Sequence, residues 1–282
     1  MVQTEFRELR ELDNLANKGI GSVLDTAQTL QIDAHFPVMT VTLNRPKVAN
    51  AMSLKMVEKL MSVMKLVELE QYRVLVLQGG GHNFCAGGDI KDMQTAVGDE
   101  VALVRLNRAF GLMIETANKL PAVVICLLQG AVLGGGFGLA CISDVAIADG
   151  SATFALPETS LGLIPAQIAP FVVQRVGLTA ARRLALLGIR IKSEEALRLG
   201  VIHQLATDHD DLVLQAKKSV DLALKCAPKA NRTTKALLHD VSEQPLEQLL
   251  DIAAVDFAFS VANEGSEGAA AFMQKRAAKW IR

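Results

Sequence analysis

Two glycine-rich turns are the segments of this 282-residue sequence that could place backbone amides against a ligand. Residues 83–90 (NFCAGGDI) follow a strand predicted over 73–78, and residues 130–138 (GAVLGGGFG) follow a strand predicted over 122–128. Glycine lets the backbone approach a ligand closely, and unpaired N–H groups at a strand end or helix N-terminus favour an anion. The two turns therefore predict a site for an anion or a developing oxyanion.

The motifs of several other chemistries are missing from the sequence. It contains no P-loop, no GxSxG and no HExxH, and residues 134–138 lack the last glycine of GxGxxG. The five histidines are scattered without ligand spacing, so we expect no metal site and no cofactor. Close packing alone can explain one glycine-rich turn, but two at successive strand ends favour a ligand site.

Composition excludes further classes of protein. A net charge of −1 with one Trp and one Tyr argues against a nucleic-acid partner.

Residues 120–143 are uncharged and long enough to span a bilayer, but Pro121 and the glycine run predict a buried strand, loop and helix instead. The first 20 residues carry mixed charges and no apolar run, so we expect no secretory signal. Four cysteines without CxxC spacing indicate reduced, mostly buried thiols in a cytoplasmic protein.

The elements that must position these turns alternate between strand and helix patterns up to about residue 206. This alternation predicts an α/β core with parallel strands over residues 26–206. After it, four helical patterns predict a helical C-terminal region over 207–282, while residues 1–25 look like an added helix. The predicted strands cover 40–43, 73–78, 122–128, 144–148 and 152–155; the predicted helices cover 53–67, 101–118, 210–225, 229–241, 246–263 and 266–280.

Several motifs together resemble the enoyl-CoA hydratase/isomerase superfamily, which has the crotonase fold. They are FCAGGDIKDM (84–93), GAVLGGGFGLACISDVAIA (130–148) and FALPETSLGLIP (154–165), with NRPKVANAMS (44–53) and ARRLALLGIRIKSEEALRLGVI (181–202) in the family's order and spacing. The residues at 134–148 and 156–173 are most similar to those of the isohexenylglutaconyl-CoA hydratases of acyclic terpene degradation.

The resemblance implies a spiral of ββα turns with a C-terminal helical region that forms a homotrimer or a dimer of trimers. It implies an acyl-CoA substrate and no cofactor beyond that CoA. The two oxyanion amides fall on Ala86 and Gly135 by motif position, and the substrate lies along Ala86, Gly87, Gly88, Asp89 and Ile90. Lys47 and Lys91 are candidates for the CoA phosphates, although a plain surface charge is the favoured interpretation of each.

The sequence departs from the family at one catalytic position. Hydratases of this family usually carry two glutamates, but here Glu158 remains and Gly138 stands at the other position. Apolar neighbours of Glu158 predict a raised carboxyl pKa, which suits a general acid and base. We expect Gly138 to leave a wider cavity for a branched or carboxylated acyl group, and Asp89 and Asp144 to cap backbone donors.

These expectations predict a hydratase that adds water to a branched glutaconyl-type acyl-CoA. A double-bond isomerase remains the main alternative, because one carboxylate is enough to move one proton. A protein that keeps the fold and binds acyl-CoA or RNA without catalysis is a further alternative.

Overall fold

The computed structural model describes residues 29–281, so the helix predicted over 1–25 lies outside the described residues. A six-stranded sheet has the order β1-β2-β3-β4-β6-β9, and a three-stranded sheet has the order β5-β7-β8. The large sheet contains β1 (Leu30–His35), β2 (Val38–Leu43), β3 (Val74–Gly79), β4 (Val123–Leu128), β6 (Val145–Asp149) and β9 (Gln204–Ala206); the small one contains β5 (Ala131–Leu133), β7 (Thr153–Ala155) and β8 (Arg190–Lys192). From β2 onward the large sheet is parallel, as predicted, whereas β1 forms an antiparallel hairpin with β2 that the sequence patterns did not indicate.

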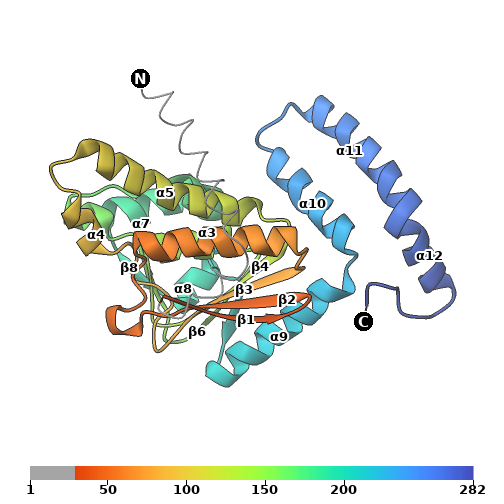
Figure 1. Ribbon diagram of the computed structural model, residues 1–282, viewed down its shortest axis with the longest axis horizontal. Coiled ribbons are helices and arrows are strands. Elements are labelled where there is room, and N and C mark those ends of the chain that lie inside the picture. The colour runs from red at the N-terminus through yellow and green to blue at the C-terminus, as the bar shows by residue number, and fades with distance from the viewer. Residues whose placement is uncertain (1–28, 282) are drawn as a thin grey trace.

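The large sheet is covered on both faces, which explains why its central strands are apolar throughout. Successive side chains of a strand point to opposite faces. Leu75 and Leu77 of β3 therefore pack in the core formed with α3, α5, α6 and α7, while Val74 and Val76 pack against α9 (Figure 1). The bounds of these helices are α3 (Leu54–Leu69), α5 (Glu100–Lys119), α6 (Gly135–Ile142), α7 (Ala169–Leu187) and α9 (His209–Lys225).

Ser53 begins α3 as predicted, because its side chain accepts a hydrogen bond from the Met56 amide. Residues 120–143 form β4, β5 and α6, which confirms the predicted strand, loop and helix. In the part of the chain that the structure describes, no helix combines the length and apolarity needed to cross a membrane. The remaining short elements are η2 (Pro46–Val48), α4 (Ile90–Thr95), η3 (Glu158–Leu161) and α8 (Ser193–Arg198).

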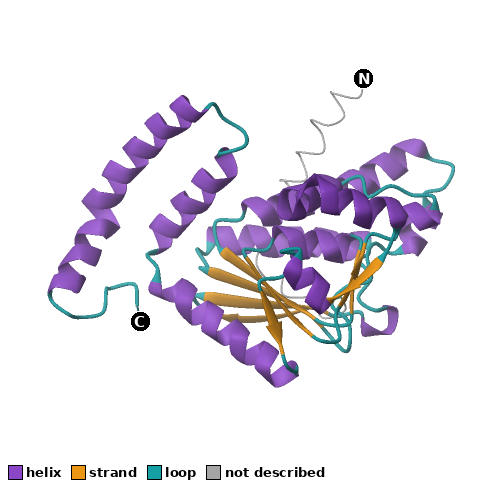
Figure 2. Cartoon of the chain, turned by 180° about the vertical axis from the view of Figure 1, so that it is seen from behind, coloured by secondary structure: helices purple, strands orange, loops and turns teal. Residues whose placement is uncertain are grey.

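The C-terminal region is helical, but its first helix packs differently from the others. Leu212 and Ala216 of α9 are buried against the large sheet. The following helices, α10 (Pro228–Asp240), α11 (Leu246–Ser260) and α12 (Ser266–Met273), form an arm that stands beside this core (Figures 1 and 2). A π-helical turn, η4 (Val261–Gly265), joins α11 to α12.

The last predicted helix is shorter than the pattern suggested, because the chain turns back after Met273. The indole of Trp280 donates to the Lys225 carbonyl at the end of α9 (3.0 Å). Arg73, just before β3, donates to the carbonyls of Leu224, Cys226 and Trp280. These bonds tie residues 274–281 to the start of the arm.

The four cysteines are all unpaired. Cys85, Cys126 and Cys141 are buried, and burial raises the pKa of each of these thiols to about 12. Cys226 is exposed at the end of α9, so the expectation of buried thiols holds for three of the four.

Candidate active site

The two glycine-rich turns are joined edge to edge beyond the parallel strands β3 and β4. Phe84 donates to Gln129 (2.7 Å), Cys85 donates to Ala131 (2.9 Å), and Leu133 donates back to Cys85 (2.9 Å). Because parallel strands end at the same edge of a sheet, turns that follow neighbouring strands meet there. The sequence placed both turns at strand ends, and the structure brings them together.

The first turn presents the amide of Gly88 rather than that of Ala86. The Ala86 N–H donates to the Ala49 carbonyl (2.9 Å), so it is already paired and the expectation that it binds a ligand oxygen is wrong. On either side of Gly88, the Gly87 carbonyl accepts from Met52 (2.8 Å) and the Asp89 amide donates to Met52 (2.9 Å). This pairing turns the Gly88 N–H away from Met52, and it has no acceptor within residues 29–281.

The second turn presents the amide of Gly135, the first residue of α6. The first N–H groups of a helix lack internal partners, and the helix dipole adds positive charge there. Gly134 precedes it with φ 51°, a conformation that favours glycine, and its N–H donates to Ala155 (3.1 Å). No acceptor of the Gly135 N–H occurs within the described chain. Gly88 and Gly135 thus supply two free donors.

The pairing of strands in the small sheet positions Glu158 next to these two amides. Leu133 of β5 pairs with Ala155 of β7, which sets Gly134 beside the segment that leads into η3 and Glu158. A Cβ atom on Gly134 would lie 2.8 Å from Glu158 Oε1, so the carboxyl group contacts this glycine directly. Glycine is required at 134 for its backbone conformation and for this close approach.

The Glu158 carboxyl is held in an apolar setting. Its Oε2 atom is buried without a hydrogen-bond partner among the described residues. Burial raises the pKa of Glu158 above its ordinary value, and only one backbone hydrogen bond opposes this. A carboxyl group with a raised pKa can both give and take a proton nearer neutral pH.

Glu158, Gly88 and Gly135 line one cavity of about 400 Å³. Its walls are mostly apolar and come from α4, α5, η3 and the segment before α7. The predicted residues Ala86, Gly87, Asp89 and Ile90 line it as well. A larger cavity of about 660 Å³ lies between α5, α7 and α10, but none of the predicted site residues lines it.

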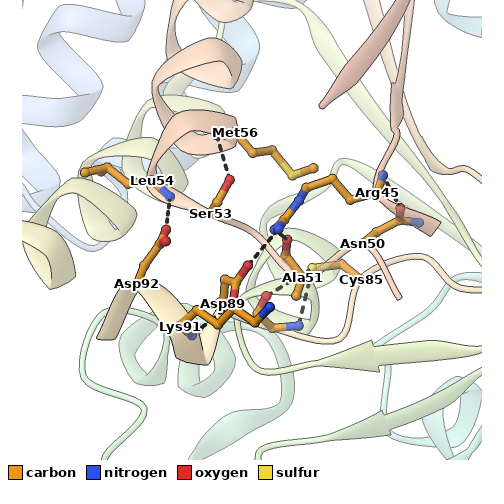
Figure 3. A network of polar contacts seen from close by, with 11 residues as sticks. Arg45, Asn50, Ala51, Ser53, Leu54, Met56, Cys85, Asp89, Lys91 and Asp92 are labelled. Atoms are coloured by element: carbon orange, nitrogen blue, oxygen red, sulfur yellow. Dashed lines mark hydrogen bonds and ion pairs between the residues drawn. The ribbon is translucent and has the colours of Figure 1, made fainter. Parts of the chain in front are cut away.

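A polar network holds the end of the first turn and the start of α4 in place (Figure 3). The Arg45 guanidinium donates to Asp89 Oδ2 (2.8 Å), and Asp89 Oδ1 caps α4 by accepting from the Lys91 amide (3.0 Å). Burial raises the pKa of Asp89, but the bonds from Arg45 and the Lys91 amide outweigh it, so this pKa lies below its usual value. Asp92 accepts from the Leu54 amide (2.6 Å). The predicted capping role of Asp89 is confirmed.

Asp144 also has the predicted capping role. Its carboxylate accepts from the Val124 amide (2.7 Å) and pairs with Lys235 of α10 (2.6 Å). This pair links the arm to the core. The sequence had no signal for Lys235 as a partner, because the two residues are 91 positions apart.

Three predicted residues do not line the cavity: Lys47, Lys91 and Gly138. The two lysines are exposed on η2 and α4. A Cβ atom on Gly138 would lie 2.6 Å from Ile168 Cγ2 and 3.5 Å from Ile114 Cδ1. The space beside Gly138 is therefore filled by Ile168, and the expectation that this glycine widens the cavity is wrong.

The Gly138–Ile168 contact can be tested by a double-mutant cycle. We expect Gly138→Ala to lower the free energy of unfolding by about 1–3 kcal/mol, because the added methyl group overpacks the core. In an Ile168→Ala background the same change should cost clearly less, since the atom it meets is gone. Denaturant unfolding of the four proteins measures this coupling. Equal costs in both backgrounds would mean that Ile168 does not determine the need for glycine.

Comparison with known proteins identifies the family of this chain. The sequence matches the family Enoyl-CoA hydratase/isomerase over residues 34–282. The chain therefore belongs to this family. It is 33% identical to a probable enoyl-CoA hydratase of Bacillus subtilis over 256 residues, which cover 89% of this chain and 96% of that protein.

Solved structures show the same fold. An enoyl-CoA hydratase/isomerase from Marinobacter aquaeolei is 50% identical, with a TM-score of 0.87 over 90% of this chain and 99% of that one. Pseudomonas aeruginosa AtuE is 52% identical, with a TM-score of 0.88 over 90% of this chain and 100% of that one. These matches confirm the predicted crotonase-like fold with its helical C-terminal region.

Proposed function

We propose that this protein is a hydratase that adds water across the α,β double bond of a branched, glutaconyl-type acyl-CoA, such as isohexenylglutaconyl-CoA or methylglutaconyl-CoA. The observation that carries the proposal is the position of Glu158. Its carboxyl group, whose Oε2 atom has no partner among the described residues, lies against the glycine that precedes the free Gly135 amide. The Gly88 amide lines the same cavity.

Each group has a defined part in the proposed reaction. The Gly88 and Gly135 amides bind the thioester oxygen and stabilise the negative charge that it gains as the enolate forms. Glu158 takes a proton from water while the water oxygen attacks the β-carbon, and then returns that proton to the α-carbon. Asp89 and Asp92 also line the cavity, but Asp89 is paired with Arg45 and Asp92 with the Leu54 amide, which leaves Glu158 as the carboxylate for proton transfer.

The alternative is a double-bond isomerase, in which Glu158 moves one proton between two carbons of the acyl chain. Incubation with enoyl-CoAs that differ in length, branching and distal charge separates the two reactions. Hydration adds the mass of one water to the product and removes the absorbance of the conjugated thioester. A product of unchanged mass with a shifted double bond would establish the isomerase, and no reaction with any thioester would favour a non-catalytic acyl-CoA-binding protein.

The apolar wall supports a branched hydrocarbon chain in the substrate. Leu103, Leu106, Phe110 and Ile168 line the cavity, whose volume of about 400 Å³ is within the usual range for a small-molecule site. The proposed enzyme needs no cofactor beyond the CoA of its substrate, because backbone donors stabilise the enolate and one carboxyl group carries out both proton transfers.

We further propose that the arm assembles the protein into a homotrimer or a dimer of trimers. Val255, Phe257 and Phe259 of α11 and Phe272 of α12 expose 61–86% of their surface in one protomer. Large exposed apolar patches mark protein interfaces. Sedimentation that returned the 30.2 kDa mass of one chain would contradict this assembly. The four unpaired cysteines support a reducing, cytoplasmic setting.

A further inference from the structure

Two uncharged polar side chains line the cavity without a part in the proposed reaction. Asn107 comes from the middle of α5, and Gln167 from the segment just before α7. The Gln167 Nε2 group donates to Asn107 Oδ1 (2.9 Å). The two side chains therefore form one polar unit across two walls of a mostly apolar cavity.

This unit lies beside a glycine and an arginine of the same helix. A Cβ atom on Gly111 would lie only 1.8 Å from Gln167 Oε1, so the glycine makes the room that the Gln167 side chain occupies. Arg108 Nη1 would lie 2.9 Å from the same Cβ position. The Arg108 guanidinium thus lies beside Gln167, close to the polar unit but outside the cavity lining.

The hydrogen bond of the unit leaves the Asn107 Nδ2 group and the Gln167 Oε1 atom without a partner among residues 29–281. Asn107 Oδ1 accepts from Gln167, so the Asn107 Nδ2 group keeps its two N–H donors, and no acceptor for them occurs among residues 29–281. The other polar side chains in the wall are Asp89, Asp92 and Glu158, and within the described residues no lysine or arginine lines the cavity. The two free N–H donors of Asn107 can therefore bind an acceptor oxygen of a ligand.

We propose that Asn107, oriented by Gln167, binds a carboxylate at the far end of the acyl chain. The inference rests on the proposed function and gives its glutaconyl-type substrate a recognition group. Asp89 does not oppose an anion strongly, because it is paired with Arg45. Arg108, behind Gln167, is paired with Glu115 (3.0 Å), so the amide donors of Asn107 are the groups that bind the carboxylate. A carboxylate bound by amide donors forms charge-assisted hydrogen bonds.

The test measures binding of unreactive saturated thioesters, so it does not require turnover. The probes are 3-methylglutaryl-CoA and 3,5-dimethylhexanoyl-CoA, in which an isopropyl group replaces the carboxylate. We expect the parent protein to bind the carboxylated probe more tightly. Asn107→Asp should lower the ratio of the two affinities by about 10-fold to 100-fold, because a hydrogen-bond donor to a charged group is replaced by a like charge.

The Asp variant keeps the acceptor that Gln167 uses, so a merely structural role of Asn107 would leave the ratio unchanged. Asn107→Leu should lower the ratio too, but by less than Asp, since it removes the donors without adding charge. Asn118→Asp, the same substitution on the same helix but outside this cavity, serves as the control and should keep the parental ratio. A ratio in Asn107→Asp equal to that of the parent would overturn the inference. Selective binding of the carboxylated probe without turnover of any enoyl-CoA would instead support the inference and contradict the proposed hydratase.

Discussion

Replacing Glu158 by glutamine is expected to lower kcat for hydration by about 10²-fold to 10⁴-fold, the usual contribution of a general acid or base. Glutamine has the shape of glutamate but cannot take a proton from water or return one to the α-carbon. The amides of Gly88 and Gly135 remain, so CoA thioesters should still bind with nearly unchanged affinity. Steady-state kinetics on a hydrated substrate, with calorimetric titration of a saturated thioester, measures both quantities.

The pH dependence gives an independent readout of the same residue. Burial raises the pKa of Glu158, and a general base must be deprotonated to act. We therefore expect kcat/KM of the parent to fall as the pH decreases through this raised pKa, at a higher pH than an ordinary glutamate would cause. Glu158→Gln should lack this acidic limb. Glu194→Gln, on the exposed face of α8, should keep both the limb and the rate. Activity of Glu158→Gln within about threefold of the parent would show that water is activated elsewhere.

Replacing Gly135 by proline should lower kcat by about 10²-fold to 10³-fold, the usual effect of losing one oxyanion donor, or about 3–4 kcal/mol of transition-state stabilisation. Proline lacks the N–H that we assign to the thioester oxygen. Gly135 is the first residue of α6, a position where proline is well tolerated because its N–H has no partner within the helix. The helix should therefore survive the change.

The matched control is Gly135→Ala, which adds a side chain but keeps the N–H. A Cβ atom at this position would meet the end of the Met52 side chain at 2.5 Å, and both variants share that contact. Alanine should therefore cost much less activity than proline, while both proteins keep similar melting temperatures. Equal losses in the two variants would attribute the effect to Met52 rather than to the missing donor.

The sequence alone determined the type of chemistry and most of the elements. Apolar runs such as 73–78 and 122–128 required strands buried on both faces, and the glycines after them required close backbone turns. Ser53 fixed the start of a helix through a local capping bond. Glu158 was found because the segment 154–165 around it resembles the family's glutamate motif. These features depend on neighbours within a few residues, which the sequence displays directly.

The tertiary structure decided which atoms of those motifs are free. Ala86 and Gly88 are two small residues of one turn, and only the bond from Ala86 to the distant Ala49 carbonyl shows that Gly88 holds the unpaired donor. Gly138 stands where the family's motif usually carries a glutamate, which suggested open space. Ile168 from another segment fills the space beside this glycine. Asn107 and Gln167 are 60 positions apart, so no local pattern could join them. Hydrogen-bond saturation and packing depend on contacts between distant segments, and they are set only when the chain folds.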